Sequence, residues 1–346
     1  MSRPLLRALG IVVAAALLWC AGWYGIAAYI EHRTLAWVER QRAAGTAMEA
    51  KRLAIDGFPF TWRLVAEDYV IGQGDPVAQR VSGHRLEATL LPWRLHDIPI
   101  RLPGMHRFER QNVGGGFVFE IEATRPEARL LLTPAGRMRE LDLDLGGLTL
   151  RVPNTAATLT AARASIVARE IDPIDPKTRD FWNLAVALDQ VDPPSGWMAP
   201  FNRPIRRAGF EIGVRGERVR AASPADAVIA WRDSMGVVEL RDLTLDWSPL
   251  VVTGAGAGGL DRQNRPEAAL SFRVSGYEEL LNALVESRQI GTRQATGLRI
   301  ALAALAKPNP QTRRNEVVLP ITAQEGQLTI LGFPLLPLPP IALPQR

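Results

Sequence analysis

The sequence predicts a mainly β (α+β) protein, in which an N-terminal transmembrane helix precedes a large curved antiparallel sheet with an apolar groove. Two observations predict this class: an uncharged run opens the chain, and segments of two-residue alternation, among them residues 184–188 and 210–214, recur after it. Such alternation is typical of strands with one buried and one exposed face. A few punctuated helical segments are expected to pack near the C-terminal half.

The opening run covers residues 8–30 and contains no charged side chain. A helix of that length extends about 35 Å, enough to cross a hydrocarbon core of about 30 Å. Tryptophan and tyrosine crowd its far end, where aromatic rings favour the headgroup boundary. The residues expected to mark the anchor are Ala8, Leu17, Leu18, Trp19, Trp23 and Ile30.

Charge predicts the orientation of this helix. Arg3 and Arg7 favour a cytoplasmic N-terminus. We therefore expect a single-pass protein of the bacterial inner membrane with a periplasmic C-terminal domain. A cleaved signal peptide is the alternative, but its apolar core is about 7–15 residues long, shorter than this one. Trp19 also disfavours lipoprotein processing at Cys20.

The domain organisation follows from these segments. Residues 1–30 are expected to form a cytoplasmic stub and transmembrane anchor, and residues 31–51 a helical stalk. Residues 52–346 then form the β-rich exported domain, which can be divided into halves at 52–195 and 196–346. Cys20 is the single cysteine, so the exported part contains no disulfide.

An apolar face opens the exported domain. Alternation places four residues on one side of a strand that Pro59 begins or confines to an edge. These residues are candidates for the lining of a groove, with ordinary core as the alternative. They are Phe58, Phe60, Trp62 and Leu64.

Helix signals appear later in the chain. Ser223 is placed to cap a helix that begins at Pro224, and Ser275 with Glu278 forms a capping box. A third helix is expected over residues 294–306. The Pro-rich tail, residues 332–340, favours an extended conformation and either blocks a sheet edge or binds a partner.

No catalytic, cofactor-binding or metal site is predicted. The four histidines lack metal-ligand spacing, and the G-x-G-x-x-G match at residues 254–259 leads to a turn rather than a helix. The acids Glu140, Asp142 and Asp144 share one strand face, where a cation site competes with a solvated surface. Basic residues are scattered, which excludes the basic stripe typical of nucleic-acid binding.

The order of several segments resembles a known family. Asp-Gly-Phe-Pro-Phe at 56–60 follows the anchor, Leu-Thr-Leu-Asp-Trp occupies 243–247, and a glycine-rich hairpin covers 256–274. Gly-Tyr-Glu-Glu-Leu-Leu then occupies 276–281, before a Gly-Gln-Leu turn at 326–328. This order is similar to that of the bacterial uncharacterised family DUF2125 along nearly the whole chain. The resemblance transfers no catalytic residue.

The anchor followed by amphipathic strands also resembles, in architecture alone, AsmA-like envelope proteins, which have apolar-floored grooves and are linked to lipid traffic. The resemblance implies a non-enzymatic envelope protein that binds phospholipid or lipid A and whose partner is the inner membrane. The alternative is a scaffold that holds other envelope proteins through a sheet edge or the Pro-rich tail. Fold analogy alone does not decide between them.

Overall fold

The computed structural model describes residues 3–43, 45–73, 79–112, 115–171, 180–194, 200–201, 203–217, 224–310 and 314–341. Within these residues the fold is mainly β, with antiparallel strand pairings and four helices, as the sequence predicts. Contacts divide the chain into two compact units. Unit 1 comprises Met1–Arg137 and Leu150–Thr155, and unit 2 comprises Met138–Thr149 and Ala156–Arg346.

Unit 1 begins with the long helix α1 (Arg3–Ala43), within which Gly10–Ala43 is long and apolar enough to span a membrane. The helix ends before the predicted limit of the stalk at residue 51. The remainder of the predicted stalk belongs to strand β1 (Thr46–Asp56), because its backbone pairs with β2 (Trp62–Gln73) from Thr46 onward. A ladder satisfies those backbone groups as completely as a helix would.

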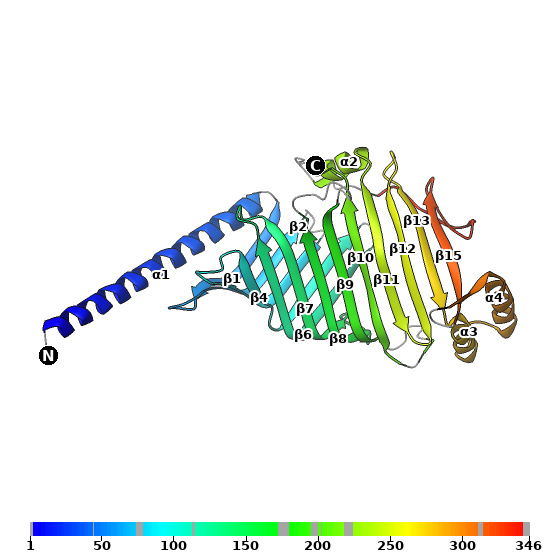
Figure 1. The fold of residues 1–346 in the computed structure, drawn as a ribbon, viewed down its shortest axis with the longest axis horizontal. Helices are drawn as coiled ribbons and strands as arrows, with labels where there is room; N and C mark the ends of the chain where they lie inside the picture. The colour runs from blue at the N-terminus through cyan, green and yellow to red at the C-terminus, as the bar shows by residue number, and fades with distance from the viewer. Residues whose placement is uncertain are drawn as a thin grey trace. The chain divides into compact units, whose positions relative to one another are not determined.

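The remaining strands of unit 1 extend this hairpin (Figure 1). Strand β3 (Gln79–Leu90) pairs with β2 on one side. Its other side pairs with two short strands, β4 (Asp97–Arg101) and β5 (Met105–Asn112). Both short strands also pair with the long β6 (Gly115–Leu132), so they share the space between β3 and β6.

Helix α1 is held against unit 1 by indole hydrogen bonds. Trp19 Nε1 donates to the Pro59 carbonyl oxygen at 2.9 Å, and Trp23 Nε1 donates to the Thr61 carbonyl oxygen at 2.9 Å. In the reverse direction, Trp62 Nε1 donates to the Trp23 carbonyl oxygen at 3.2 Å. The middle of α1 is therefore attached to the segment that connects β1 to β2.

That connecting segment is a turn, which corrects the first part of the predicted strand over residues 58–64, whereas residues 62–64 do lie in β2. The Thr61 amide donates to the Gly57 carbonyl oxygen at 3.1 Å, which closes the turn before β2 begins. Phe58 and Phe60 are accordingly 46% and 63% exposed, whereas Trp62, within β2, is 6% exposed. Period-two alternation also arises in a turn that happens to alternate in composition, and only backbone pairing distinguishes the two.

Unit 2 contains most of the strands. From β8 to β13 each strand pairs with the next, β13 pairs with β15, and β15 also pairs with β14 and β16, which pairs with β17. Strands β8–β13 and β15 therefore form a continuous sheet (Figure 1). The strands are β7 (Met138–Arg151, in unit 2 as far as Thr149), β8 (Thr158–Glu170), β9 (Asp180–Asp192), β10 (Ile205–Arg215), β11 (Val237–Trp247), β12 (Leu250–Leu260), β13 (Pro266–Ser275), β14 (Ala306–Asn309), β15 (Arg314–Gln324), β16 (Gln327–Ile330) and β17 (Phe333–Pro337).

This pairing bears on the division at residue 195 that the sequence suggested. Strands β9 and β10 flank that point and pair directly with each other, from Ile205 with Val191 to Arg215 with Asp180. A domain boundary there would cut a ladder of backbone hydrogen bonds. The contacts instead separate the two units around residues 137–156.

The described part of unit 2 contains the helices α2 (Pro224–Asp233), α3 (Tyr277–Glu286) and α4 (Thr292–Leu305). The predicted cap of α2, Ser223, lies outside the described residues. The capping box predicted for α3 is wrong, because Gly276, at φ +75°, is the N-cap and no side chain bonds there. Ser275 instead ends β13, where it pairs with Glu316 and Val251.

The Pro-rich tail forms β17, which pairs with β16 through a register shift. An extended strand agrees with the backbone conformation predicted for this segment. Its apolar side chains, however, do not pack against the sheet, since Phe333 is 75% and Leu335 is 59% exposed.

Candidate functional site

One face of the unit 2 sheet carries an unbroken row of apolar or small residues across eight strands. At a spacing of about 4.8 Å between neighbouring strands, such a row is about 34 Å wide. The backbone register aligns, from β8 to β16, Ala168, Leu184, Ile212, Leu240, Gly256, Leu270, Ile321 and Ile330. We call these eight residues the central row.

A second apolar row lies two residues further along each strand, or three in β11, where a register shift adds one residue between Leu240 and Leu243. It contains Ile166, Val186, Phe210, Leu243, Gly254, Phe272 and Leu319. The ring of Phe272 lies over Gly254, where a Cβ would come within 2.4 Å of the ring. The glycines that matched a dinucleotide motif therefore lie within β12 and make room for a large neighbour. We call these two rows, together with Trp182, Val214 and Val238 on the other side of the central row, the apolar face.

The apolar face is only half-buried. All eight residues of the central row keep intermediate exposure, and Phe210 of the second row is 36% exposed. Among the described residues, Val317 is the only large side chain that is fully buried. The middle of a sheet packed against a second layer would normally be fully buried. This face is therefore partly open to solvent.

Helix α2 covers one end of the apolar face and forms a pocket of about 420 Å³ with it. The sheet contributes Trp182, Val214 and Val238, which are aligned in register on β9, β10 and β11. The helix contributes Val228 and Trp231. This volume lies within the usual range of small-molecule sites, about 300–1,000 Å³, and such sites are mostly apolar.

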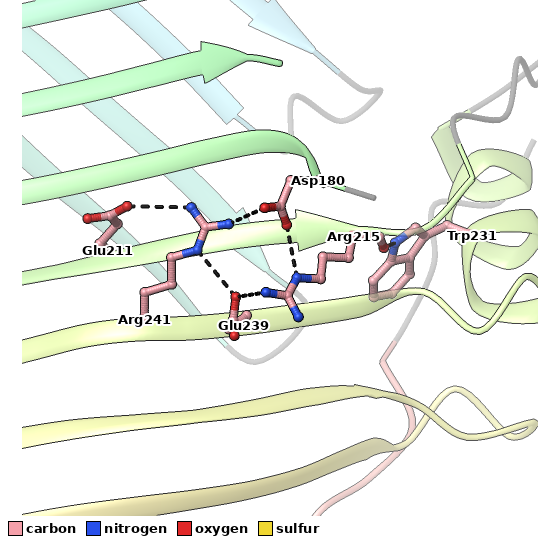
Figure 2. A network of polar contacts seen from close by, with 6 residues as sticks. All are labelled: Asp180, Glu211, Arg215, Trp231, Glu239 and Arg241. Carbon is pink, nitrogen blue, oxygen red and sulfur yellow. Dashed lines mark hydrogen bonds and ion pairs between the residues drawn. The ribbon is translucent and has the colours of Figure 1, made fainter. Parts of the chain in front are cut away.

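Trp231 fixes the position of α2. Its Nε1 donates a 2.7 Å hydrogen bond to the Arg215 carbonyl oxygen, and its ring lies against Gly236, where a Cβ would come within 2.2 Å. Figure 2 shows this bond beside the polar residues of the neighbouring strands. One residue of β10 thus connects the pocket to the side chains of the opposite face.

Those side chains form an ionic network across β9, β10 and β11 (Figure 2). Arg215 Nε donates to Asp180 Oδ1 at 3.0 Å, and its Nη2 bonds Glu239. Arg241 Nη2 donates to Asp180 Oδ2 at 2.6 Å, and its Nη1 lies 3.6 Å from Glu211 Oε1. Asp180 is 5% exposed, and its carboxylate bridges both guanidinium groups.

Gly213 makes this bridge possible. The guanidinium of Arg241 lies over Gly213 on β10, where a Cβ would come within 2.6 Å of Nη2. Burial lowers the pKa of Arg241, but Glu239 and Asp180 outweigh it through hydrogen bonds and charge and raise the pKa overall. Each carboxylate named here is bound to a guanidinium, so the network holds three strands together and offers no free acid or base for catalysis.

The acids singled out in β7 belong to the same pattern of ion pairs. Glu140 Oε1 accepts from Arg169 Nη2 at 2.9 Å, and Asp144 is paired with Arg163. Both arginines come from β8. Among the described residues there is no cluster of three or more potential metal ligands. This face of β7 therefore carries ion pairs with β8 at Glu140 and Asp144, two of the acids considered for a cation site.

Comparison with known proteins decides the family. The model of an uncharacterised protein family conserved in bacteria, DUF2125, matches residues 23–339. The chain belongs to the DUF2125 family. Neither the curated proteins nor the solved structures gave a match. The family match begins within α1 and includes both the ionic network and the pocket of this DUF2125 protein.

The anchor residues predicted for the DUF2125 protein all lie in α1. Leu17 and Leu18 are 66% and 73% exposed, and Trp19 is 48% exposed. Trp23, by contrast, is 5% exposed because it packs against Trp62. The remaining two are Ile30, which is partly buried, and Ala8.

The residues proposed for a groove lie elsewhere in the DUF2125 protein than the apolar face. Phe58 and Phe60 are in the turn that contacts α1, and Trp62 is buried. Leu64 lies in β2 with intermediate exposure. All four belong to unit 1, whereas the apolar face and its pocket are in unit 2.

Sequence reasoning missed the ionic network and the pocket. The alternation of Leu184 and Val186 in β9, and of Phe210 and Ile212 in β10, did indicate that these residues share a face. Which strand lies beside which is a long-range property, so the meeting of Asp180 with two arginines had no local signal. The pocket likewise depends on where α2 lies on the sheet.

Proposed function

We propose that this DUF2125 protein is a membrane-anchored envelope protein that binds lipid acyl chains on the apolar face of unit 2. The observation that carries the proposal is the half-burial of the central row. A row about 34 Å wide, with no fully buried member, is an apolar surface large enough for an extended ligand. Acyl chains would bind by non-directional burial, at about 0.8 kcal/mol per methylene.

The membrane part of the proposal is supported by α1. Its apolar stretch is long enough to cross a bilayer, and Arg3 and Arg7 at its start favour a cytoplasmic N-terminus. The domain would then be periplasmic, in the inner membrane of a bacterium. An anchored lipid-binding domain has its ligand available in the adjacent leaflet.

The pocket under α2 is the part of the apolar face best suited to enclose a ligand. Elsewhere on the central row a ligand would remain partly exposed, while here it would contact both sheet and helix. Glu170 and Glu217 also line the pocket, so its edge is polar. Phospholipid and lipid A share the acyl chains this surface would recognise, and the test below distinguishes them by mass.

Photocrosslinking of the full chain in bacterial cells tests the proposal. The photoreactive residue p-benzoylphenylalanine replaces Phe210, which lies on the apolar face. A matched control carries it at Ser271, an exposed residue on the opposite face of β13. After irradiation, mass spectrometry of the purified chain identifies the adducts.

We expect lipid adducts at position 210 and few at position 271. Their masses would show whether the ligand is a phospholipid or lipid A. Equal labelling at both positions, or no lipid at position 210, would contradict binding on the apolar face.

A scaffold function is the second candidate, and the exposed strand β17 favours it. Phe333 and Leu335 present apolar side chains to solvent at 75% and 59% exposure. Such a strand fits partners that recognise extended, Pro-rich segments. The photoreactive residue placed at Phe333 should then capture envelope proteins, while position 210 captures no lipid.

A further inference from the structure

We infer that the turn over residues 57–61 lies in the bilayer beside α1, so that Phe58 and Phe60 contact lipid directly. This inference rests on the proposed membrane anchoring, and it concerns unit 1 rather than the lipid-binding face of unit 2. The starting observation is that two indoles of the apolar helix, Trp19 and Trp23, donate their hydrogen bonds to this turn.

The position of those indoles along α1 sets the depth of the turn. If residues 8–30 occupy the bilayer, Trp23 and Trp19 lie about 10 and 16 Å below its far boundary, at 1.5 Å per residue. If the span instead covers residues 4–23, about 30 Å long, Trp23 lies at the far boundary and Trp19 about 6 Å below it. Because the turn is bonded to both, each placement brings it into contact with lipid.

Several backbone groups of the turn are already paired within the protein. A polar backbone group in hydrocarbon must find its partner within the protein. The Gly57 carbonyl oxygen accepts from the Thr61 amide and hydroxyl, both at 3.1 Å. The Pro59 and Thr61 carbonyl oxygens accept from the two indoles, and Pro59 carries no N–H.

The exposed side chains of the turn continue the apolar surface of α1. Phe58 stacks on Tyr24 with ring centroids 5.7 Å apart, and it meets Trp23 edge-on at 5.4 Å. Phe60 and Tyr24 are 63% and 62% exposed. Aromatic side chains concentrate where proteins cross the membrane–water interface. If the turn faced water instead of lipid, the exposed parts of Phe58 and Phe60 would be apolar surface in contact with solvent beside an apolar helix.

Charge marks where this surface ends. Residues 57–62 are uncharged, and Asp56 and Arg63 flank them as an ion pair at 3.5 Å. Trp62 pairs with Leu90, so the segment after β3 lies at the same end of the strands as the turn. That segment exposes Trp93 by 65% and Leu95 by 50%. This end of the β2–β3 ladder thus exposes several aromatic and apolar side chains, alongside the exposed Arg94 and His96.

Spin-label depth measurement on the full chain in phospholipid vesicles tests the inference. Cys20→Ala removes the native thiol, and single cysteines are then introduced and labelled with a nitroxide. Phe60→Cys reports on the turn and Leu18→Cys, at a 73% exposed position, reports on the anchor. Lys51→Cys is the matched control, because the Lys51 side chain is 78% exposed on β1 in the same unit.

Collisions with oxygen, which dissolves in lipid, are compared with collisions with a water-soluble nickel chelate. We expect the labels at positions 18 and 60 to favour oxygen several-fold over the label at position 51. A label at 60 that behaves like the one at 51, while the label at 18 remains in lipid, would overturn the inference and leave the anchor intact. A label at 18 that is accessible to nickel would overturn both.

Discussion

The indole of Trp231 donates a 2.7 Å hydrogen bond to the carbonyl oxygen of Arg215, whose own side chain bonds Asp180 and Glu239 on the other face of the sheet. One residue of β10 therefore anchors α2 and belongs to the ionic network (Figure 2). The position of the pocket and the alignment of three strands are linked at this residue.

Removing the indole N–H should loosen α2. We expect Trp231→Phe to lower the free energy of unfolding by about 1 kcal/mol, the usual net value of one hydrogen bond. Chemical denaturation followed by circular dichroism measures the change. Trp37→Phe, at a position 45% exposed in α1, is the control and should change stability little. An equal effect from both variants would show that the bond to Arg215 contributes nothing specific.

Gly213 should not tolerate a side chain. A methyl group there would come within 2.6 Å of the Arg241 guanidinium, so Gly213→Ala should displace Arg241 from Asp180 and cost about 1–3 kcal/mol. Gly297 is exposed within α4 and has no heavy atom within 4 Å of the added Cβ. Gly297→Ala should instead stabilise by about 0.5–1 kcal/mol, because alanine favours helix. Thermal unfolding of both variants tests the opposite signs.

Two adjacent valines in β15 should differ sharply in their contribution to stability. Val317 is fully buried, whereas Val318 is 41% exposed on the other side of the strand. We expect Val317→Ala to cost about 2 kcal/mol through lost burial and a small cavity, and Val318→Ala to cost less than about 0.5 kcal/mol. Denaturation midpoints give both values. Similar losses of stability in the two variants would contradict the full burial of Val317.

The Asp97–Arg129 pair should make part of the stability pH-dependent. Two hydrogen bonds from Arg129, at 2.6 and 2.7 Å, hold the pKa of Asp97 below its ordinary value of 3.8. A carboxylate with a lowered folded-state pKa stabilises the fold above its unfolded pKa, and this contribution is lost as pH falls through the folded value.

The test compares wild type with Asp97→Asn over pH. The difference between their unfolding midpoints should be largest near pH 6 and should disappear at pH values well below 3.8. A difference that stays constant over this range would assign the effect to packing rather than to the ionised carboxylate.

The spacing of apolar and polar residues was sufficient to predict those helices and strands in which this spacing is regular. The uncharged run gave α1, and the alternation in residues 184–188 and 210–214 gave strands whose apolar residues share one face. These predictions succeed because side-chain spacing of 3.6 or 2 residues directly reflects backbone geometry. They were less reliable at boundaries, where the helix ends at Ala43 and the predicted cap of α3 is replaced by Gly276.

Phe58, Phe60 and Trp62 show the limit of such patterns. In sequence they alternate as a strand face, yet the first two lie in a turn and only the third is buried in a strand. The difference comes from the hydrogen bonds that Trp19 and Trp23 donate to the turn, about forty residues away along the chain. No local pattern records a contact over that separation.

The sequence by itself determined the apolar helix, the β-rich class, the family and the residues able to form an apolar face. Only the tertiary structure decided that Asp180 meets Arg215 and Arg241, that α2 forms a pocket over Val214 and Val238, and that the central row stays half-buried. The physical reason is that periodicity assigns a side chain to a face. Its neighbours on that face are set by the register between strands far apart in sequence, and its burial by whatever else packs there.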